Sequence, residues 1–257
     1  MAVISFASPK GGTGKTTLVA NVAEAVHALG YEVFVLELDP QNTLRVHFGF
    51  PLQDDAGLAG AFIRDDWSLM ARRAACGVHV LPFGTSTPAQ RAEFGRQLAE
   101  PGFLRARLAT LQRTPGALVL IDLPSGYSAA LPAVAGVAQV RLTLLQADPG
   151  SIALLPLLQD KRYYGDAAAA GSVHRLLLNK VDNRTRLGRE ISEFMQREHG
   201  RDLIGQVHED SFVPEAAAQQ RLIGQYATSS RAARDVQQVA RQLASLVMQS
   251  QQGSAGY

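Results

Sequence analysis

A glycine-rich loop lies between an apolar segment and a helical one, and it constrains the fold of this chain more than any other feature. Ala2–Ser8 is a short apolar run typical of a buried strand, and Lys15–Leu29 repeats apolar residues at helical spacing. The order Gly14-Lys15-Thr16 between them is the core of a Walker A phosphate loop in its strand–loop–helix setting. The alternative is a glycine-rich turn that only joins the strand to the helix, but such a turn would not require Lys at position 15 and Thr at position 16. The loop reads Pro9-Lys10-Gly11-Gly12-Thr13-Gly14-Lys15-Thr16-Thr17.

Each residue type in this loop suits the binding of a nucleotide's phosphates. Glycines permit positive φ and let backbone N–H groups approach phosphate closely. The start of the following helix adds the positive end of its dipole. We expect Lys15 to reach the β- and γ-phosphates and the Thr16 hydroxyl to bind Mg²⁺.

The rest of the chain alternates apolar runs with helical segments, which predicts an α/β fold: a doubly wound, mainly parallel sheet with helices on both faces. We expect residues 1–248 to form a single domain and residues 249–257 to be a disordered tail. Ligands of such folds bind at the carboxyl ends of the strands. The later strands are predicted at Val33–Leu38, Val78–Leu81, Leu118–Ile121, Val140–Leu145, Val173–Leu178 and Leu203–Val207.

Acidic residues follow two of these strands. Leu118–Ile121 ends at Asp122, an aliphatic run typical of a Walker B strand whose carboxylate holds Mg²⁺. A helix cap is the alternative, but the preceding phosphate loop argues against it. Gly126 could offer a backbone N–H to the γ-phosphate. The other strand ends in Glu37-Leu38-Asp39.

The string Lys-Gly-Gly-Thr-Gly-Lys-Thr-Thr, residues 10–17, resembles the deviant Walker A loop of the MinD/ParA family. The resemblance implies ATP as the nucleotide and a homodimer that closes around it, with Lys10 reaching the partner's nucleotide. It also implies that Asp39 positions the attacking water, so Lys10, Lys15 and Asp39 are the predicted catalytic residues. Thr16, Asp39 and Asp122 are the predicted metal-site residues. Glu37 departs from the family, which has Asp there.

The resemblance extends to the base of the nucleotide. Asn179 ends a strand at the place of the family's adenine-contacting Asn. His208 and Asp210 occupy the place of a family motif that packs beside the base, although His208 replaces its proline. The predicted nucleotide-binding residues are therefore Lys10, Gly11, Gly12, Thr13, Gly14, Lys15, Thr16, Thr17, Gly126, Asn179, His208 and Asp210.

Composition narrows the branch of the family. The single cysteine, Cys76, excludes the iron–sulfur branch, whose subunits need two. MinD proteins end in a basic membrane-surface helix, whereas Arg231–Met248 has an apolar stripe and three basic residues, more typical of core packing. The net charge of +2 does not favour nucleic acid binding. A ParA-type DNA-binding patch could be built from Arg175, Arg184, Arg186, Arg189, Arg197 and Arg201, although such charges more often form solvated helix faces.

Several short segments resemble the BcsQ branch of the family, among them Gly77–Gly84, Ile121–Pro124 and Asp210–Arg234. This branch implies a cytoplasmic protein that assists assembly or placement of the bacterial cellulose synthase complex, with protein partners there. It also implies recruitment to the inner membrane or cell pole through those partners, and no nucleic acid. The hypotheses are a weak regulatory ATPase, a non-hydrolysing ATP-bound scaffold, and a ParA-type DNA-partitioning ATPase. The role of Arg72 and Arg73 stays undecided: they form either an interaction site or part of an exposed helix face.

Overall fold

The computed structural model describes residues 1–59, 66–111, 116–159, 162–165, 169 and 171–254 of the 257-residue chain. Its centre is a sheet whose eight strands are hydrogen-bonded in the order β3-β4-β2-β5-β1-β6-β7-β8. The strands are β1 (Ala2–Ala7), β2 (Val33–Glu37), β3 (Arg72–Arg73), β4 (His79–Leu81), β5 (Leu118–Asp122), β6 (Val140–Gln146), β7 (Val173–Val181) and β8 (Leu203–His208).

The pairing of these strands is parallel throughout except between β3 and β4, which confirms the predicted doubly wound, mainly parallel sheet. Strand β3 was missed because two residues are too few to show an alternating pattern. It consists of Arg72 and Arg73, so the interpretation of these arginines as an exposed helix face is wrong. The guanidinium of Arg72 pairs with Asp54 and lies over the ring of Phe50, which ties this edge strand to the preceding loop.

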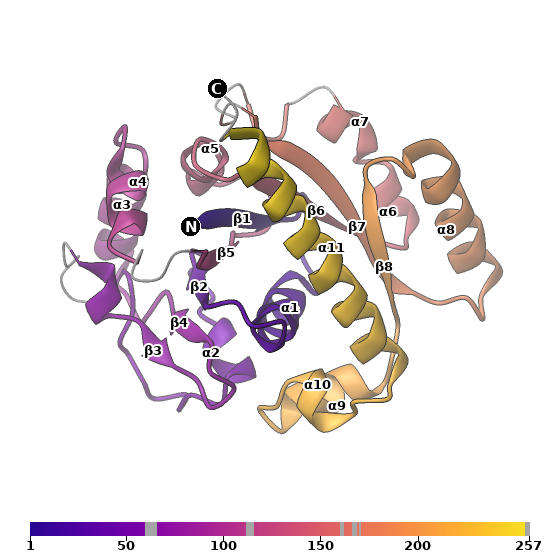
Figure 1. Ribbon diagram of the computed structural model, residues 1–257, viewed down its shortest axis with the longest axis horizontal. Helices are drawn as coiled ribbons and strands as arrows, with labels where there is room; N and C mark the ends of the chain where they lie inside the picture. The colour runs from indigo at the N-terminus through magenta and orange to yellow at the C-terminus, as the bar shows by residue number, and fades with distance from the viewer. Residues whose placement is uncertain (60–65, 112–115, 160–161, 166–168, 170, 255–257) are drawn as a thin grey trace.

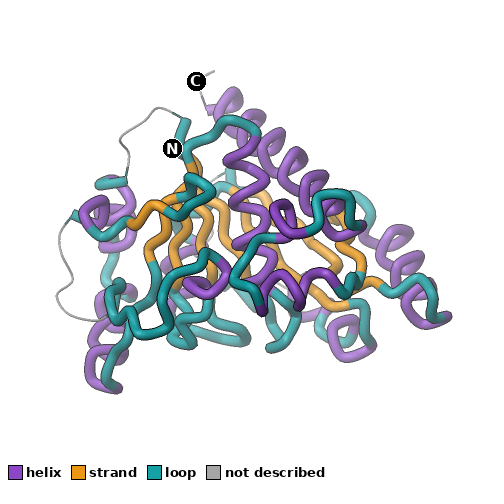
Figure 2. Tube along the Cα trace, turned by 90° about the horizontal axis from the view of Figure 1, so that it is seen from below, coloured by secondary structure: helices purple, strands orange, loops and turns teal. Residues whose placement is uncertain are grey.

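Helices cover both faces of the sheet, as the sequence predicts (Figures 1 and 2). Along β1 the side chains alternate between two apolar cores, with Ile4 and Phe6 in one and Val3 and Ala7 in the other. The first core includes residues of α1 (Lys15–Ala28), α2 (Leu44–His47), α9 (Phe212–Ala218), α10 (Ile223–Tyr226) and α11 (Arg231–Ser254). Packed with the second are η1 (Trp67–Leu69), α3 (Pro88–Leu98), α4 (Phe103–Ala109), α5 (Ala130–Ala135), α6 (Pro149–Ile152), α7 (Leu155–Gln159) and α8 (Arg186–His199).

Helix α11 lies across one face of the sheet, against α1 and β8 (Figure 1). Its apolar stripe is buried, including Val236, Val239, Leu243 and Val247, as expected of a core-packing helix. The helix continues to Ser254, so the predicted start of a disordered tail at residue 249 is wrong; residues 255–257 lie outside the described part. Within the part that the structure describes, no helix combines the length and apolar character needed to cross a membrane.

The strand order brings the predicted site residues to one edge of the sheet. β1 lies between β5 and β6, and β5 lies between β1 and β2. In the register of these strands, Asp122 is level with Glu37 on one side and with Phe6 on the other. The phosphate loop begins at Pro9, two residues after β1 ends at Ala7, so loop and carboxylates meet at the carboxyl ends of neighbouring strands.

Candidate functional site

The phosphate loop joins the end of β1 to the start of α1. Gly12 and Gly14 have φ values of 78° and 83°, in the left-handed region that favours glycine. A Cβ atom on Gly11 or Gly12 would meet nothing within 4 Å, so the space beside the loop is open there. A Cβ atom on Gly14 would lie 2.7 Å from Nδ2 of Asn179, so Gly14 is required by both conformation and space.

Lys15, Thr16 and Asp122 form a buried polar cluster beneath the loop. The Lys15 ammonium donates to Oδ1 of Asp122, and the Thr16 hydroxyl donates to Oδ2 over 2.7 Å. Asp122 is completely buried and Lys15 is nearly so. Burial raises the pKa of the Asp122 carboxyl, while the charge of Lys15 and its hydrogen bond oppose that shift. The predicted Walker A and Walker B residues are therefore in direct contact.

This cluster and the loop fit a nucleoside triphosphate with Mg²⁺. Mg²⁺ prefers oxygen ligands and is commonly bound by one or two carboxylates, with phosphates and water completing its shell. The Thr16 hydroxyl and the Asp122 carboxylate are such oxygens and already lie together. Lys15 and the N–H groups of the glycine loop would hold the phosphates. The bound metal supplies neutralisation of phosphate charge.

The two acids that end β2 have different environments. Asp39 lies near the cluster, with Oδ2 3.9 Å from the Lys15 ammonium and Oδ1 accepting from the N–H of Gln41. Glu37 is completely buried, and its Oε1 accepts from the N–H of Leu44 at the start of α2. Burial raises the pKa of Glu37 to about 8. The longer acid therefore anchors the loop after β2 from inside the protein, and Asp39 is the acid nearer Lys15.

Lys10 lies at the outer side of the loop, where it is bound within its own chain. Its ammonium donates to Asp148, the residue that caps α6. Partial burial acts against ionisation of Asp148, yet the hydrogen bonds from Lys10 and Ser151 hold the pKa of its carboxyl below the ordinary value. The predicted contact of Lys10 with a partner's nucleotide stays a prediction and would require this ion pair to open.

Other predicted loop contacts are also engaged within the chain. The N–H of Gly126 donates to the carbonyl of Ser8 over 2.8 Å, and the hydroxyl of Thr13 lies 3.1 Å from that of Ser8. The Thr17 hydroxyl lies 3.4 Å from Nε2 of His47. A contact from Gly126 to the γ-phosphate stays a prediction, since its N–H now has a protein partner.

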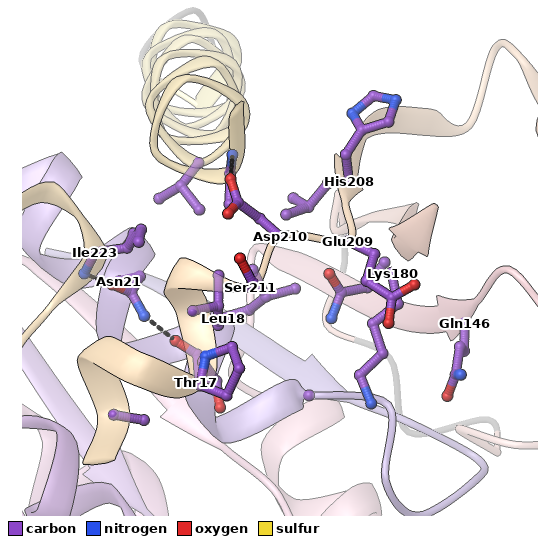
Figure 3. A pocket seen from close by; sticks show the side chains of 18 of the residues that line it. Thr17, Leu18, Asn21, Gln146, Lys180, His208, Glu209, Asp210, Ser211 and Ile223 are labelled. Atoms are coloured by element: carbon purple, nitrogen blue, oxygen red, sulfur yellow. Dashed lines mark hydrogen bonds between the residues drawn. The ribbon is translucent and has the colours of Figure 1, made fainter. Parts of the chain in front are cut away.

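A cavity of about 720 Å³ adjoins the loop, within the size range of small-molecule sites, and Asn179, His208 and Asp210 all line it (Figure 3). Each has protein partners. The Asn179 amide donates to the carbonyl of Thr13, His208 bonds to Asp235, and Asp210 accepts from the N–H of Ala232. The structure thus brings the three predicted base-site residues together; their contact with the base stays a prediction.

The sequence interpretation missed several residues at this site. Gln146 and Asp148 come at or just after the carboxyl end of β6, so the strand-end rule that identified Asp122 could have found them. Lys180 follows Asn179 directly and also lines the cavity. His47 has no such signal, because a single histidine in a short helix is usually structural.

Among the residues that the structure describes, five of the six arginines considered for a DNA patch, all but Arg201, have partners within the chain that hold their guanidinium groups. Arg184 pairs with Asp182, and Arg189 donates to the carbonyls of Asn183 and Arg184. Three further ion pairs join Arg175 with Asp202, Arg186 with Glu190, and Arg197 with Glu198. Neighbouring acids reduce the positive potential that phosphate backbones require.

A family model described as cellulose biosynthesis protein BcsQ matches residues 1–243. The chain belongs to the BcsQ family. Among curated proteins, BcsQ of Salmonella typhimurium is 26% identical over 240 residues, which cover 92% of this chain and 91% of the relative. BcsQ of Escherichia coli is 34% identical over 85 residues, about a third of each chain.

Solved structures confirm the fold of this BcsQ family member. The cell division ATPase MinD of Pyrococcus furiosus superposes with a TM-score of 0.74 at 21% identity, covering 95% of this chain and 99% of MinD. MinD of Pyrococcus horikoshii, solved with Mg-ADP, has a TM-score of 0.70 at 18% identity, covering 97% and 98%. The predicted MinD/ParA-like fold and the resemblance to BcsQ are thereby confirmed.

Proposed function

We propose that this protein binds ATP with Mg²⁺, dimerises around the nucleotide, and acts as a weak regulatory ATPase in bacterial cellulose synthesis. The observation that carries the proposal is the contact of Lys15 and Thr16 with the buried carboxylate of Asp122, beside an open glycine loop. The Mg-ADP in the MinD structure of Pyrococcus horikoshii supports an adenine nucleotide with Mg²⁺ as the ligand. Membership of the BcsQ family supports the process.

Dimerisation is supported by the position of Lys10. Its side chain is partly exposed. Its ion-pair partner, Asp148, is also partly exposed and lies outside the buried cluster of Lys15, Thr16 and Asp122. A cation so placed can exchange an internal carboxylate for a phosphate presented by a second chain. Closure would place Lys10 opposite the partner's nucleotide and make the dimer depend on ATP.

The biological role that we propose is assistance to the assembly or placement of a cellulose synthase complex at the inner membrane or cell pole. In this scheme the ATP-bound dimer binds a protein of the complex, and hydrolysis releases it. Asp39 would position the attacking water, since it is the acid nearer to Lys15. Recruitment to the membrane would occur through partners, and the protein itself would be cytoplasmic.

The test is the solution mass of the protein without nucleotide, with ADP, and with ATP and Mg²⁺, measured beside Lys10→Ala. We expect a monomer without nucleotide or with ADP, a dimer only with ATP, and no dimer for Lys10→Ala. A monomer in every state would refute the role of Lys10. A dimer in every state would refute the ATP switch.

A non-hydrolysing scaffold is the second candidate, and the burial of Glu37 favours it. Since Glu37 is committed to the backbone of Leu44, only Asp39 of the two acids after β2 lies near Lys15. ATP turnover measured together with the purified cellulose synthase complex separates the candidates. Turnover above the rate of the Lys15→Ala protein supports the ATPase, and equal rates support the scaffold.

A further inference from the structure

Two consecutive residues of β7 reach back to the phosphate loop. Asn179 Nδ2 donates to the carbonyl of Thr13 over 2.7 Å, and Lys180 Nζ donates to the carbonyl of Gly12 over 2.8 Å. Figure 3 shows the Lys180 side chain extending from β7 toward this loop. The contacts join segments more than 160 residues apart in the sequence, so they are tertiary contacts made specifically to the loop.

The backbone of β7 is irregular where these side chains leave it. Lys180 has a φ of 55°, in the left-handed region that non-glycine residues rarely adopt. The pairing of β7 with β8 also shifts register between Leu178 and Val181. Irregularities of this kind re-aim side chains and gather at functional sites, where the surrounding structure maintains them. Here the re-aimed side chain is the one that meets the loop.

The acceptors are informative because of peptide geometry. In a trans peptide the C=O bond and the N–H bond of the next residue lie in one plane and point in opposite directions. The carbonyl of Gly12 shares its plane with the N–H of Thr13, and the carbonyl of Thr13 shares its plane with the N–H of Gly14. Donors that hold both carbonyls toward β7 therefore fix the direction of both N–H groups. A phosphate loop needs such N–H groups aligned before the anion arrives.

We propose that Asn179 and Lys180 are positioning residues that preorganise the phosphate loop for triphosphate binding by holding the loop backbone. The inference rests on the proposed nucleotide-binding function and gives Asn179 a role in addition to the base contact implied by the family resemblance. Its support is the pair of hydrogen bonds to neighbouring loop carbonyls, together with the left-handed backbone of Lys180.

Lys180 offers the cleaner test of the two. Asn179 is buried and its amide closes the space beside Gly14, so a variant there could disturb folding. Lys180 is exposed, and Lys180→Met keeps most of the apolar stem while removing the donor. The matched control is Arg186→Met, since Arg186 is an exposed cation that pairs with Glu190 on α8 and is not among the residues that line the cavity.

The experiment measures affinity for ATP and for inorganic tripolyphosphate by calorimetry, each with Mg²⁺, in the full chain. For Lys180→Met we expect about tenfold weaker binding of both ligands, the size expected from losing one charged hydrogen bond. In the nucleotide-free variant the ¹⁵N order parameters of Gly12 and Thr13 should fall from about 0.85 to below about 0.6. Arg186→Met should leave the order parameters and both affinities unchanged.

Three results would overturn the inference. Unchanged affinities would remove any role for Lys180. Loss of ATP affinity alone would place Lys180 at the base or ribose. Loss of both affinities with a rigid loop would make Lys180 a direct phosphate ligand. If the wild-type protein binds neither ligand, the proposed function is wrong and the inference falls with it. Results on the variants alone test only the inference.

Discussion

The Lys10 ammonium and the Asp148 carboxylate lie 2.5 Å apart, which joins the phosphate loop to the first turn of α6. Asp148 uses its other oxygen to accept from the N–H of Ser151. The lysine that the proposed dimer sends across its interface is thus neutralised by its own chain. The dimer can form only if this ion pair breaks. The free energy that the pair contributes to the single chain therefore opposes dimerisation.

Asp148→Asn should therefore dimerise more readily with ATP and Mg²⁺. Asn preserves a helix cap on α6 but removes the charge that holds Lys10. Because partly exposed ion pairs are worth about 1 kcal/mol or less and the dimer has to break one in each chain, we expect up to about thirtyfold tighter dimerisation. Sedimentation equilibrium measures the constant, and Lys10→Ala/Asp148→Asn should remain monomeric. Weaker dimerisation of Asp148→Asn would mean that Asp148 itself supports the interface.

Lys15→Ala should destabilise the protein even in the absence of nucleotide. It leaves the carboxylate of Asp122 buried with the Thr16 hydroxyl but without its cation. Breaking a buried pair from one side typically costs about 3 kcal/mol of unfolding free energy. Chemical denaturation of nucleotide-free protein measures this loss. The double variant Lys15→Ala/Asp122→Asn should recover part of it, and no recovery would show that the loss arises elsewhere.

Two substitutions of Glu37 should show whether the length of its side chain or its charge matters for stability. Glu37→Asp withdraws the carboxylate from the N–H of Leu44 and should lower the unfolding free energy by about 2 kcal/mol. Glu37→Gln keeps an acceptor at the same reach and should change it by less than about 1 kcal/mol. Denaturation curves of both variants at pH 7 provide the comparison. Equal losses in the two variants would contradict the anchoring role of Glu37.

His174 predicts a pH dependence of stability. Its imidazole forms a hydrogen bond with the Thr143 hydroxyl. Burial lowers the pKa of His174 to about 4; the positive charges of Arg141 and Arg175 add to this shift, and the negative charge of Asp202 opposes it. The unfolded chain, with a pKa near 6.5, binds more protons between pH 4 and 6.5. Stability should therefore fall as pH falls through this window, by about 2 kcal/mol from pH 7 to pH 5.

The same denaturation experiment on His174→Gln isolates this contribution from other titrating groups. Gln has no proton to bind in this range, so the variant should lose about 2 kcal/mol less than wild type between the two pH values. Identical pH profiles would show that His174 is already protonated in the folded protein or reached by water.

Much of the fold follows from short-range patterns that the sequence displays directly. A strand such as Leu118–Asp122 is aliphatic on both faces because helices cover both sides of a parallel sheet. The phosphate loop is equally visible, since its chemistry requires glycines, Lys15 and Thr16 at fixed spacing. Asp122 follows from its place at a strand end, and its contact with Lys15 needs only parallel neighbouring strands.

The remaining features depend on distances that the sequence does not encode locally. Asp148 becomes the partner of Lys10 only because β6 lies next to β1, although β6 is separated from β1 by more than 130 residues. The sequence shows that Glu37 stands where the family has Asp, but it does not show that the folded chain uses the longer side chain to reach the N–H of Leu44. The left-handed Lys180 has no sequence signal, because its strain is maintained by tertiary contacts.

Asp39→Ala should separate binding from turnover. Asp39 lies 3.9 Å from Lys15 and is partly exposed, so its removal leaves the contact of Lys15 with the buried Asp122 in place. Affinity for ATP with Mg²⁺ should change less than about threefold, while hydrolysis should fall by at least about a hundredfold if Asp39 orients the water. The ATP-bound dimer should then persist instead of decaying. Calorimetry, phosphate release and solution mass on the same preparation give the three readings. If ATP still binds but no dimer forms, Asp39 has a structural role at the interface and the water-positioning assignment is wrong.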